Sequence, residues 1–259
     1  MNVSTSALST STSPPCNVAS PRLAGEVVSQ AGLRAEDRDR MYEILRRYFA
    51  GTDRARFEAD LLEKDTVIVL RDRESGGIRG FSTLMRMTAR IDGTDVIAFF
   101  SGDTIVEPAY WGDPALSRMW GSLVFGEADR LAIESPAARV FWFLICSGYK
   151  TWRFLPVFFR EFYPSAEAPT PPFHQRLLDV LGRQKFGDEY IPGSGIVRFH
   201  NATPLRDGVA EVTEGRLRDP QVAFFVRANP GHAAGDELAC ITEVSRSNLT
   251  RAGRRMVDG

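Results

Sequence analysis

The apolar positions of the chain recur first at helical spacing and then at strand spacing. Between Met41 and Phe49 they fall at i, i+3, i+4, i+7 and i+8, which predicts one face of a helix. A shorter helix follows, with Phe57, Leu61 and Leu62 turned inward. The charged residues that lie between these positions are the solvated faces of the two helices. The chain therefore opens its folded part with two amphipathic helices.

Three strands follow and predict an antiparallel meander. Residues 66–71 are a compact β-branched run, and residues 81–91 alternate between apolar and polar side chains. The dipeptide Asp92-Gly93 is a strong signal for a short hairpin turn, and it leads into a third strand over residues 95–106.

The third strand ends in a turn that opens a helix. A Gly-containing turn spans residues 110–114, and apolar side chains then recur at roughly helical spacing as far as Leu131. Pro114 at the first helical position, with Asp113 before it, is a typical helix start. Free N–H groups and the helix dipole point outward at such a corner, which makes it a candidate anion site.

The second half of the chain is less regular. Residues 139–146 predict a buried strand, which a strand–helix–strand connection places parallel to residues 95–106. Residues 149–163 look helical, with Pro156 kinking the helix or delaying its start. Another amphipathic helix is predicted over residues 173–185. Three strand candidates complete the sheet, namely residues 196–200, 222–226 and 238–244.

The two ends of the chain carry little that could be buried. Residues 1–32 begin with a Ser/Thr-rich stretch and predict a disordered leader. Residues 33–245 form the expected single domain. Residues 246–259 are polar, contain four arginines and are most simply a solvated basic tail.

Composition and charge limit the class of protein. The chain of 259 residues has a formal net charge of −1, so it lacks the basic excess that is typical of nucleic-acid binding. It has no apolar run long enough for a membrane span and no secretory signal. Three widely spaced cysteines without His partners argue against a disulfide framework and against a metal site. A cytoplasmic location fits these features best.

The turn after the third strand resembles the cofactor loop of the GNAT superfamily of N-acyltransferases. The family pattern is roughly V-x-P-x-x-R-G-x-G-x-G/A, and the segment VEPAYWG from Val106 to Gly112 has its length from the Val to the first Gly. Trp111 stands where the family usually has Arg, and Pro114 and Leu116 stand where it has later small residues. Pro114 has no N–H, so one potential phosphate donor is absent. The order of helices, strands and turn also agrees with that fold.

The resemblance implies an α/β fold with a mixed sheet, splayed central strands and helices on both faces. It implies transfer of an acyl group from acetyl-CoA, a longer acyl-CoA or an acyl-carrier-protein thioester to an amine of a small molecule, by direct attack in a ternary complex. The donor would lie along the cleft and the loop, at positions including Ser147, which stands for the family's Asn. The implied donor-binding residues are Thr104, Val106, Trp111, Gly112, Asp113, Ala115, Leu116 and Ser147. The plainer interpretation is an ordinary strand–turn–helix corner.

Acyl transfer to an amine needs a base, and the leaving thiolate needs an acid. Asp103 is the first candidate for the base, because it lies in an apolar segment of the cleft strand where burial would raise its pKa. It could equally be a carboxylate bonded to local N–H groups. Glu107 lies closer to the loop and is expected to be solvated. Tyr149 and Tyr163 are candidates for the acid, with packing on a helix face as the alternative role.

Two other functions compete with this one. The scaffold could be a binding or regulatory domain that has lost CoA, and the altered loop favours this hypothesis. A carrier-protein-dependent synthase of N-acyl amino acids or acyl-lactones would keep the fold and change the donor, with Arg118 and Arg130 as candidate carrier contacts. Cys146 is interpreted as a core residue because its flanks are apolar. The sequence leaves open whether the chain forms a homodimer.

Overall fold

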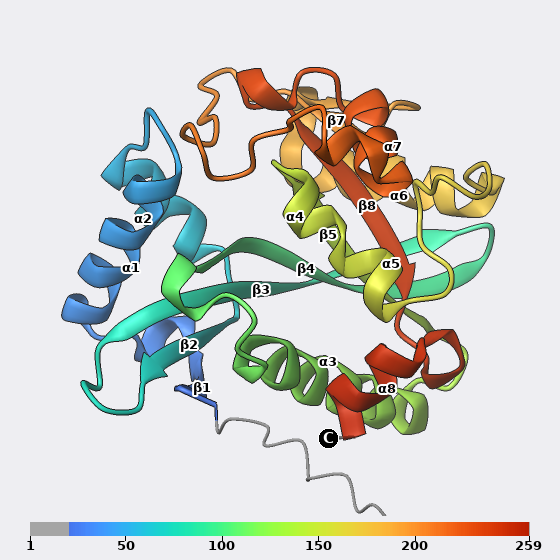
Figure 1. Cartoon of the computed structure of the whole chain (residues 1–259). Coiled ribbons are helices and arrows are strands. Elements are labelled where there is room, and N and C mark those ends of the chain that lie inside the picture. The colour runs from blue at the N-terminus through green and yellow to red at the C-terminus, as the bar shows by residue number, and fades with distance from the viewer. Residues whose placement is uncertain (1–20, 259) are drawn as a thin grey trace, which may run out of the picture.

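The computed structural model describes residues 21–258, which form one twisted mixed sheet with helices on both faces (Figure 1). Within these residues the sheet has the strand order β1-β2-β3-β4-β5-β8-β7-β6. Its neighbours pair antiparallel except for β4 and β5, which are parallel. The α/β class predicted from the sequence is confirmed. The strands are β1 (Leu23–Ser29), β2 (Thr66–Asp72), β3 (Ile78–Ile91), β4 (Thr94–Val106), β5 (Arg139–Cys146), β6 (Tyr190–Ile191), β7 (Ile196–Val197) and β8 (Glu237–Glu243).

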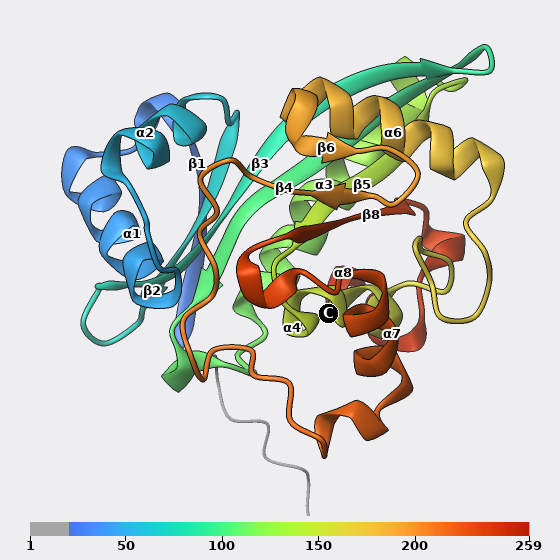
Figure 2. The same cartoon turned by 90° about the horizontal axis from the view of Figure 1, so that it is seen from above.

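The helices divide between the two faces of the sheet. Figure 2 shows α1, α2 and α6 on one side of the strands and α4, α7 and α8 on the other, with α3 beneath the sheet in Figure 1. We call these the α6 face and the α3 face. Across residues 21–258, no helix is long and apolar enough to cross a membrane. The helices are α1 (Ala35–Tyr48), α2 (Arg54–Leu62), α3 (Ala115–Glu134), α4 (Tyr149–Trp152), α5 (Phe154–Phe158), α6 (Pro172–Phe186), α7 (Pro220–Ala228) and α8 (Arg251–Asp258).

The predicted meander of β2, β3 and β4 is present. The turn between β3 and β4 places Asp92 at φ 50° and Gly93 at φ 81°. Positive φ at two successive turn residues gives the backbone twist that a two-residue hairpin needs, and Asp-Gly is a favoured pair for it. The two strands stay paired over almost their whole length, from Ile91↔Thr94 to Gly80↔Val106. This long hairpin lies between β2 and β5 and so joins the two halves of the sheet.

A β-bulge interrupts β4 near its end. Ser82 pairs with Thr104 and Leu84 pairs with Ser101, so three steps along β4 match two steps along β3. The extra residue changes the alternation of side chains along the strand. Phe100, before the bulge, and Ile105, after it, consequently pack on the same face although one position is even and the other odd.

Gly102 sits in this bulge because no side chain fits there. A Cβ at position 102 would lie 2.7 Å from Thr83 Oγ1 and 2.8 Å from Lys64 Cε. The close approach brings the Lys64 side chain, which is fully buried, against the strand. The bulge therefore couples the backbone of β4 to a buried charge.

The two parallel strands separate at the same point. Pairing of β4 with β5 runs from Val96↔Arg139 to Ser101↔Leu144, and over the described residues it goes no further, although β4 continues to Val106. Ser101 marks the last paired position, and its hydroxyl accepts hydrogen bonds from the indoles of Trp120 (3.3 Å) and Trp142 (2.9 Å). The predicted splay of the central strands is confirmed.

The predicted start of the fold near residue 33 is wrong. Residues 23–29 form the edge strand β1, which pairs with β2 from Leu23↔Asp72 to Ser29↔Thr66. Leu23 is buried but Val27 is half exposed, so an edge strand of this kind has almost no apolar signature of its own. Residues 1–20, for which disorder is predicted, lie outside the described residues.

Three later expectations also need correction. Residues 222–226 lie in α7 and not in a strand, because the side chain of Asp219 caps the helix at the Gln221 amide and Pro220 starts it. Residues 149–163 are not one helix, since the chain leaves α5 at Phe158 and Tyr163 bridges to Ile241. The basic tail forms α8, whose buried Met256 packs against α3.

Candidate active site

A cavity of about 960 Å³ opens where β4 and β5 separate. Its walls come from α2, the start of α3, α4, α5 and the segment between β7 and α7. Most of the positions implied by the resemblance line it. These are Asp103, Thr104, Val106, Trp111, Gly112, Asp113, Leu116 and Ser147. Ala115, Tyr149 and Tyr163 do not line it.

Asp103 follows Gly102 in the bulge and faces α2 and α6. Burial raises its pKa to about 6, and the negative charge of Asp60 adds to the effect. The cations Lys64, Lys185 and Arg56 act in the opposite direction without cancelling it. A carboxyl with this pKa is ionised at neutral pH and can still take up a proton readily. This is the behaviour expected of the predicted base.

An ion network lies near Asp103, in which the two lysines are buried and the two carboxylates are partly or largely exposed. Asp60 accepts from Lys64 Nζ at 2.6 Å and from Lys185 Nζ at 3.2 Å, and Lys185 also pairs with Glu63. Burial acts to raise the pKa of Asp60, but the two ammonium groups outweigh it and hold that pKa below its usual range. The network joins the end of α2 to the end of α6, so its charges are fixed beside the cavity.

Glu237 is a second carboxyl at the cavity, and it directly precedes the strand predicted over residues 238–244. It begins β8, pairs with Val197 and lines the cavity from the same face as Asp103. Burial raises its pKa to about 8, and the charge of Asp103 contributes, whereas Ser147 acts to lower it. A carboxyl with such a pKa is mostly protonated at neutral pH.

The pairing of β8 could have revealed Glu237. Residues 238–244 are predicted as a strand, and an antiparallel match to β5 brings the start of that strand beside the end of β5. Cys146 pairs with Leu238, so Glu237 falls beside Ser147 at the mouth of the splay. This inference needs the strand order of the sheet, which the local sequence does not contain.

The remaining candidates lie elsewhere. Tyr149 is buried in the core of the α3 face, and the Tyr163 ring packs on His174 with 4.7 Å between ring centroids. Cys146 is a buried core residue, as predicted, and burial raises the pKa of its thiol. Glu107 is not free in solvent, because it forms ion pairs with three arginines. These are Arg40 (2.8 Å), Arg47 (3.1 Å) and Arg79 (3.4 Å).

The loop after β4 uses several of its amides internally. Trp111 N donates to Pro108 O at 3.2 Å, and Asp113 N donates to Tyr110 O at 3.1 Å. The Asp113 carboxylate accepts from the Ala115 amide at 2.9 Å at the start of α3 and from the Arg22 amide at 2.7 Å. An internal carboxylate therefore occupies part of the place that an external anion would take. Among residues 21–258, the amides of Gly112 and Leu116 have no acceptor.

Trp111 and Lys150 close one end of the cavity. The indole N–H of Trp111 donates to Val106 O at 2.7 Å, and the Lys150 ammonium lies 3.9 Å from the centroid of the indole ring. Burial lowers the pKa of Lys150, and the nearby charge of Arg216 adds to this. The contact joins the loop after β4 to α4 across the gap between β4 and β5. A ligand that donates a hydrogen bond to Val106 O therefore competes with the indole for this acceptor.

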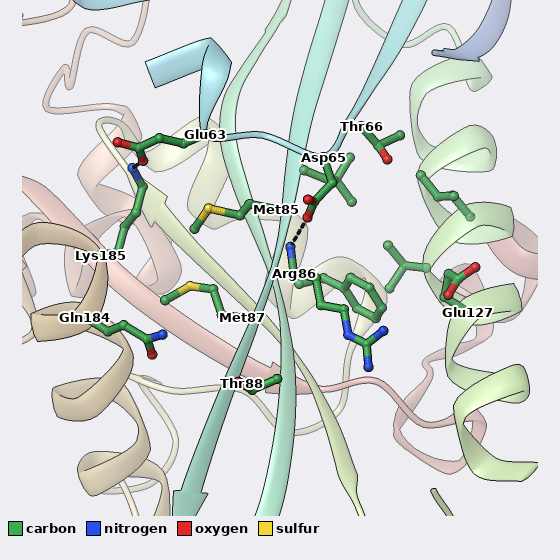
Figure 3. Close-up of a pocket in the computed structure, with 14 residues that line it drawn as sticks. Glu63, Asp65, Thr66, Met85, Arg86, Met87, Thr88, Glu127, Gln184 and Lys185 are labelled. Carbon is green, nitrogen blue, oxygen red and sulfur yellow. Dashed lines mark hydrogen bonds and ion pairs between the residues drawn. The ribbon is translucent and has the colours of Figure 1, made fainter. Parts of the chain in front are cut away.

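A second cavity of about 900 Å³ follows the free edge of β3 between α6 and α3 (Figure 3). β2 begins only at Thr66, so in the described chain β3 beyond Leu84 pairs with β4 on one side and has no strand on the other. The Asp65 carboxylate accepts from the Arg86 amide at 2.7 Å and covers the first open position. Figure 3 also shows Lys185 pointing toward Glu63.

Comparison with known proteins gives only partial likenesses. No protein-family model matches the sequence, and no curated protein matches it. A conserved protein of unknown function from Enterococcus faecalis, described as a probable N-acyltransferase, has a TM-score of 0.39 at 13% identity. The match covers 54% of this chain and 33% of that one, so this chain spans a third of its length.

Two further solved structures have similar scores. A GNAT family N-acetyltransferase from Escherichia coli, in complex with CoA, has a TM-score of 0.34 at 21% identity, covering 56% of this chain and 71% of that one. A glucosamine-6-phosphate N-acetyltransferase from Arabidopsis thaliana has a TM-score of 0.34 at 14% identity, covering 51% and 88%. Any assignment of chemistry therefore rests on the residues of this chain.

Proposed function

We propose that this protein transfers an acyl group from a thioester to the amine of a small molecule. The observation that supports this most is the pair Asp103 and Glu237. The two carboxyls line one cavity from one face, and their surroundings hold one pKa at about 6 and the other at about 8. Two titratable groups with separated pKa values can divide the work of base and acid.

The proposed reaction is a direct attack in a ternary complex. The amine nitrogen forms a bond to the thioester carbonyl carbon and gives a proton to the Asp103 carboxylate. The C–S bond then breaks, and the thiolate takes the proton of Glu237. The N–H groups of β4 after Ser101 have no β5 partner among the described residues, so they can polarise the carbonyl oxygen.

The donor we propose is an acyl-CoA. The gap between β4 and β5 suits an extended thioester arm, and aromatic side chains line its walls, so acyl chains longer than acetyl fit the proposal. The pyrophosphate would meet the amides of Gly112 and Leu116 and the Lys150 ammonium once Trp111 has moved. The aromatic lining residues include Trp120, Trp142, Phe154, Phe158 and Phe159.

The test begins with thermal melting in the presence of acetyl-CoA, a long-chain acyl-CoA and free CoA. A ligand that binds only the folded state stabilises it by about 2.7 kcal/mol at a hundredfold excess over its Kd. We expect a clear rise in Tm, followed by amine-dependent thiol release that Asp103→Asn slows by about two to four orders of magnitude. Two results would contradict the proposal. One is a rise in Tm with no release of CoA thiol in the presence of any amine tested. The other is a rate of thiol release in Asp103→Asn equal to that of the wild type.

A second candidate is a binding domain without catalysis. It is favoured by one observation, the Asp113 carboxylate at the start of α3, which an anion would have to displace. This candidate predicts no change in Tm with any acyl-CoA. An acyl-carrier-protein thioester, assayed in parallel, separates it from a carrier-dependent enzyme.

A further inference from the structure

We propose that the acceptor is an amine that also bears a carboxylate, as an amino acid does, and that Arg56 binds this carboxylate. The inference rests on the proposed function and names the substrate class of the same cavity. Arg56 lies in the first turn of α2 and lines the cavity. It is absent from the sequence-based candidates because its local sequence, a charged helix face, has no special pattern.

Arg56 is held in place without being neutralised. Its guanidinium stacks on Phe199, with 5.1 Å from Cζ to the ring centroid, and Nη1 donates to the main-chain carbonyl of Asn201. Within residues 21–258 it forms no ion pair, whereas Lys185, the other cation on this face of the cavity, pairs with Asp60 and Glu63. A fixed guanidinium with unused N–H groups is suited to bidentate binding of a carboxylate.

Arg56 is also close to the two carboxyls of the proposed mechanism. Its positive charge acts to lower the pKa of Asp103 and that of Glu237. All three groups therefore share one electrostatic environment on the α6 face. An acceptor whose carboxylate binds Arg56 can therefore extend its amine toward Asp103 within the same cavity.

The other carboxylates at this end of the cavity are already engaged. Asp53 caps α2 by accepting from the Arg56 amide at 2.9 Å, and Glu189 accepts from the His200 amide at 2.8 Å. Asp60 is held by its two lysines. Within residues 21–258 the Arg56 guanidinium therefore has no acidic partner, and its charge acts on the proposed base Asp103 and the proposed acid Glu237. A zwitterion complements this arrangement, whereas a polycationic acceptor would meet Arg56 with like charge.

The test compares acceptors that differ only in the carboxylate. The pairs are glycine and methylamine, leucine and isoamylamine, phenylalanine and phenethylamine, and lysine and cadaverine. We expect each amino acid to be the better substrate by KM. In Arg56→Gln the KM for amino acids should rise at least tenfold with little change in kcat, while KM for the simple amines stays the same. Arg56→Lys should restore part of the loss.

Arg183→Gln is the matched control, because Arg183 is exposed on α6 and does not line the cavity. Binding of the same pairs is also measured by calorimetry in Asp103→Asn, with and without the Arg56 change. Equal use of both members of each pair, or an equal loss for both in Arg56→Gln, would overturn the inference and leave acyl transfer intact. If no amine is acylated, the calorimetric comparison still decides whether Arg56 selects carboxylates.

Discussion

Glu237→Gln should make the protein more stable while it removes the proposed acid. In the fold, burial raises the pKa of Glu237 from an ordinary 4.5 to about 8. The unfolded chain therefore loses this proton several pH units before the folded protein does. The contribution of Glu237 to the free energy of unfolding is fully present below pH 4.5 and is lost as the pH rises through 8. Between these limits the free energy of unfolding falls by about 1.4 kcal/mol per pH unit.

The variant has no such proton, so its stability lacks this dependence on pH. From the same pKa values, the gap between Glu237→Gln and the wild type should widen by about 3 kcal/mol between pH 5.5 and pH 8.5. Urea unfolding at both pH values measures the gap directly. Glu74→Gln, at an exposed turn, is the control and should show no widening. A gap for Glu237→Gln that does not change with pH would refute the reasoning about burial.

Three further changes test the site. Asp103→Asn should lower kcat/KM by about two to four orders of magnitude and remove the acidic limb of its pH profile near pH 6, and an unchanged limb would exclude Asp103 as the base. Gly102→Ala should cost about 1–3 kcal/mol of unfolding free energy in urea, because its Cβ would lie 2.7 Å from Thr83 Oγ1. Thr83→Ala should recover part of that loss, and a fully stable Gly102→Ala would argue against the clash. Trp111→Ala removes the hydrogen bond to Val106 O and should lower the Kd of acetyl-CoA about fivefold, which is the equivalent of one hydrogen bond. Calorimetry measures this Kd, and weaker binding would show that the indole ring supports the donor.

The sequence predicts those parts of the fold in which a local pattern decides the structure. The alternation in β3, the Asp92-Gly93 turn and the long apolar strand β4 are all determined by neighbours within a few residues. The edge strand β1 escapes such reasoning, because its stability comes from pairing with β2 and hardly from its own apolar residues. The apolar run of residues 222–226 predicts a strand although it lies in helix α7, because a run this short does not distinguish a strand from a helix.

The residues of the candidate site also fall into two groups, those that the local sequence indicates and those that only the tertiary structure brings to the cavity. Asp103 could be found from the sequence because a carboxylate in an apolar strand is conspicuous. Glu237 and Arg56 could not, since each acquires its role only when β8 lies beside β5 and α2 reaches the cavity. The candidate acids Tyr149 and Tyr163 do not line the cavity, because Tyr149 packs in the core of the α3 face and the chain beyond α5 brings Tyr163 beside β8.

The bulge at Gly102 also separates two halves of the long hairpin. Toward the Asp92-Gly93 turn, β4 follows one alternation of side chains and packs against α3 and α6. Beyond Gly102 it follows another and packs against α1 and α2. A single strand can therefore supply two separate clusters on one face of the sheet, the cluster under α6 before the bulge and the cluster under α1 and α2 after it.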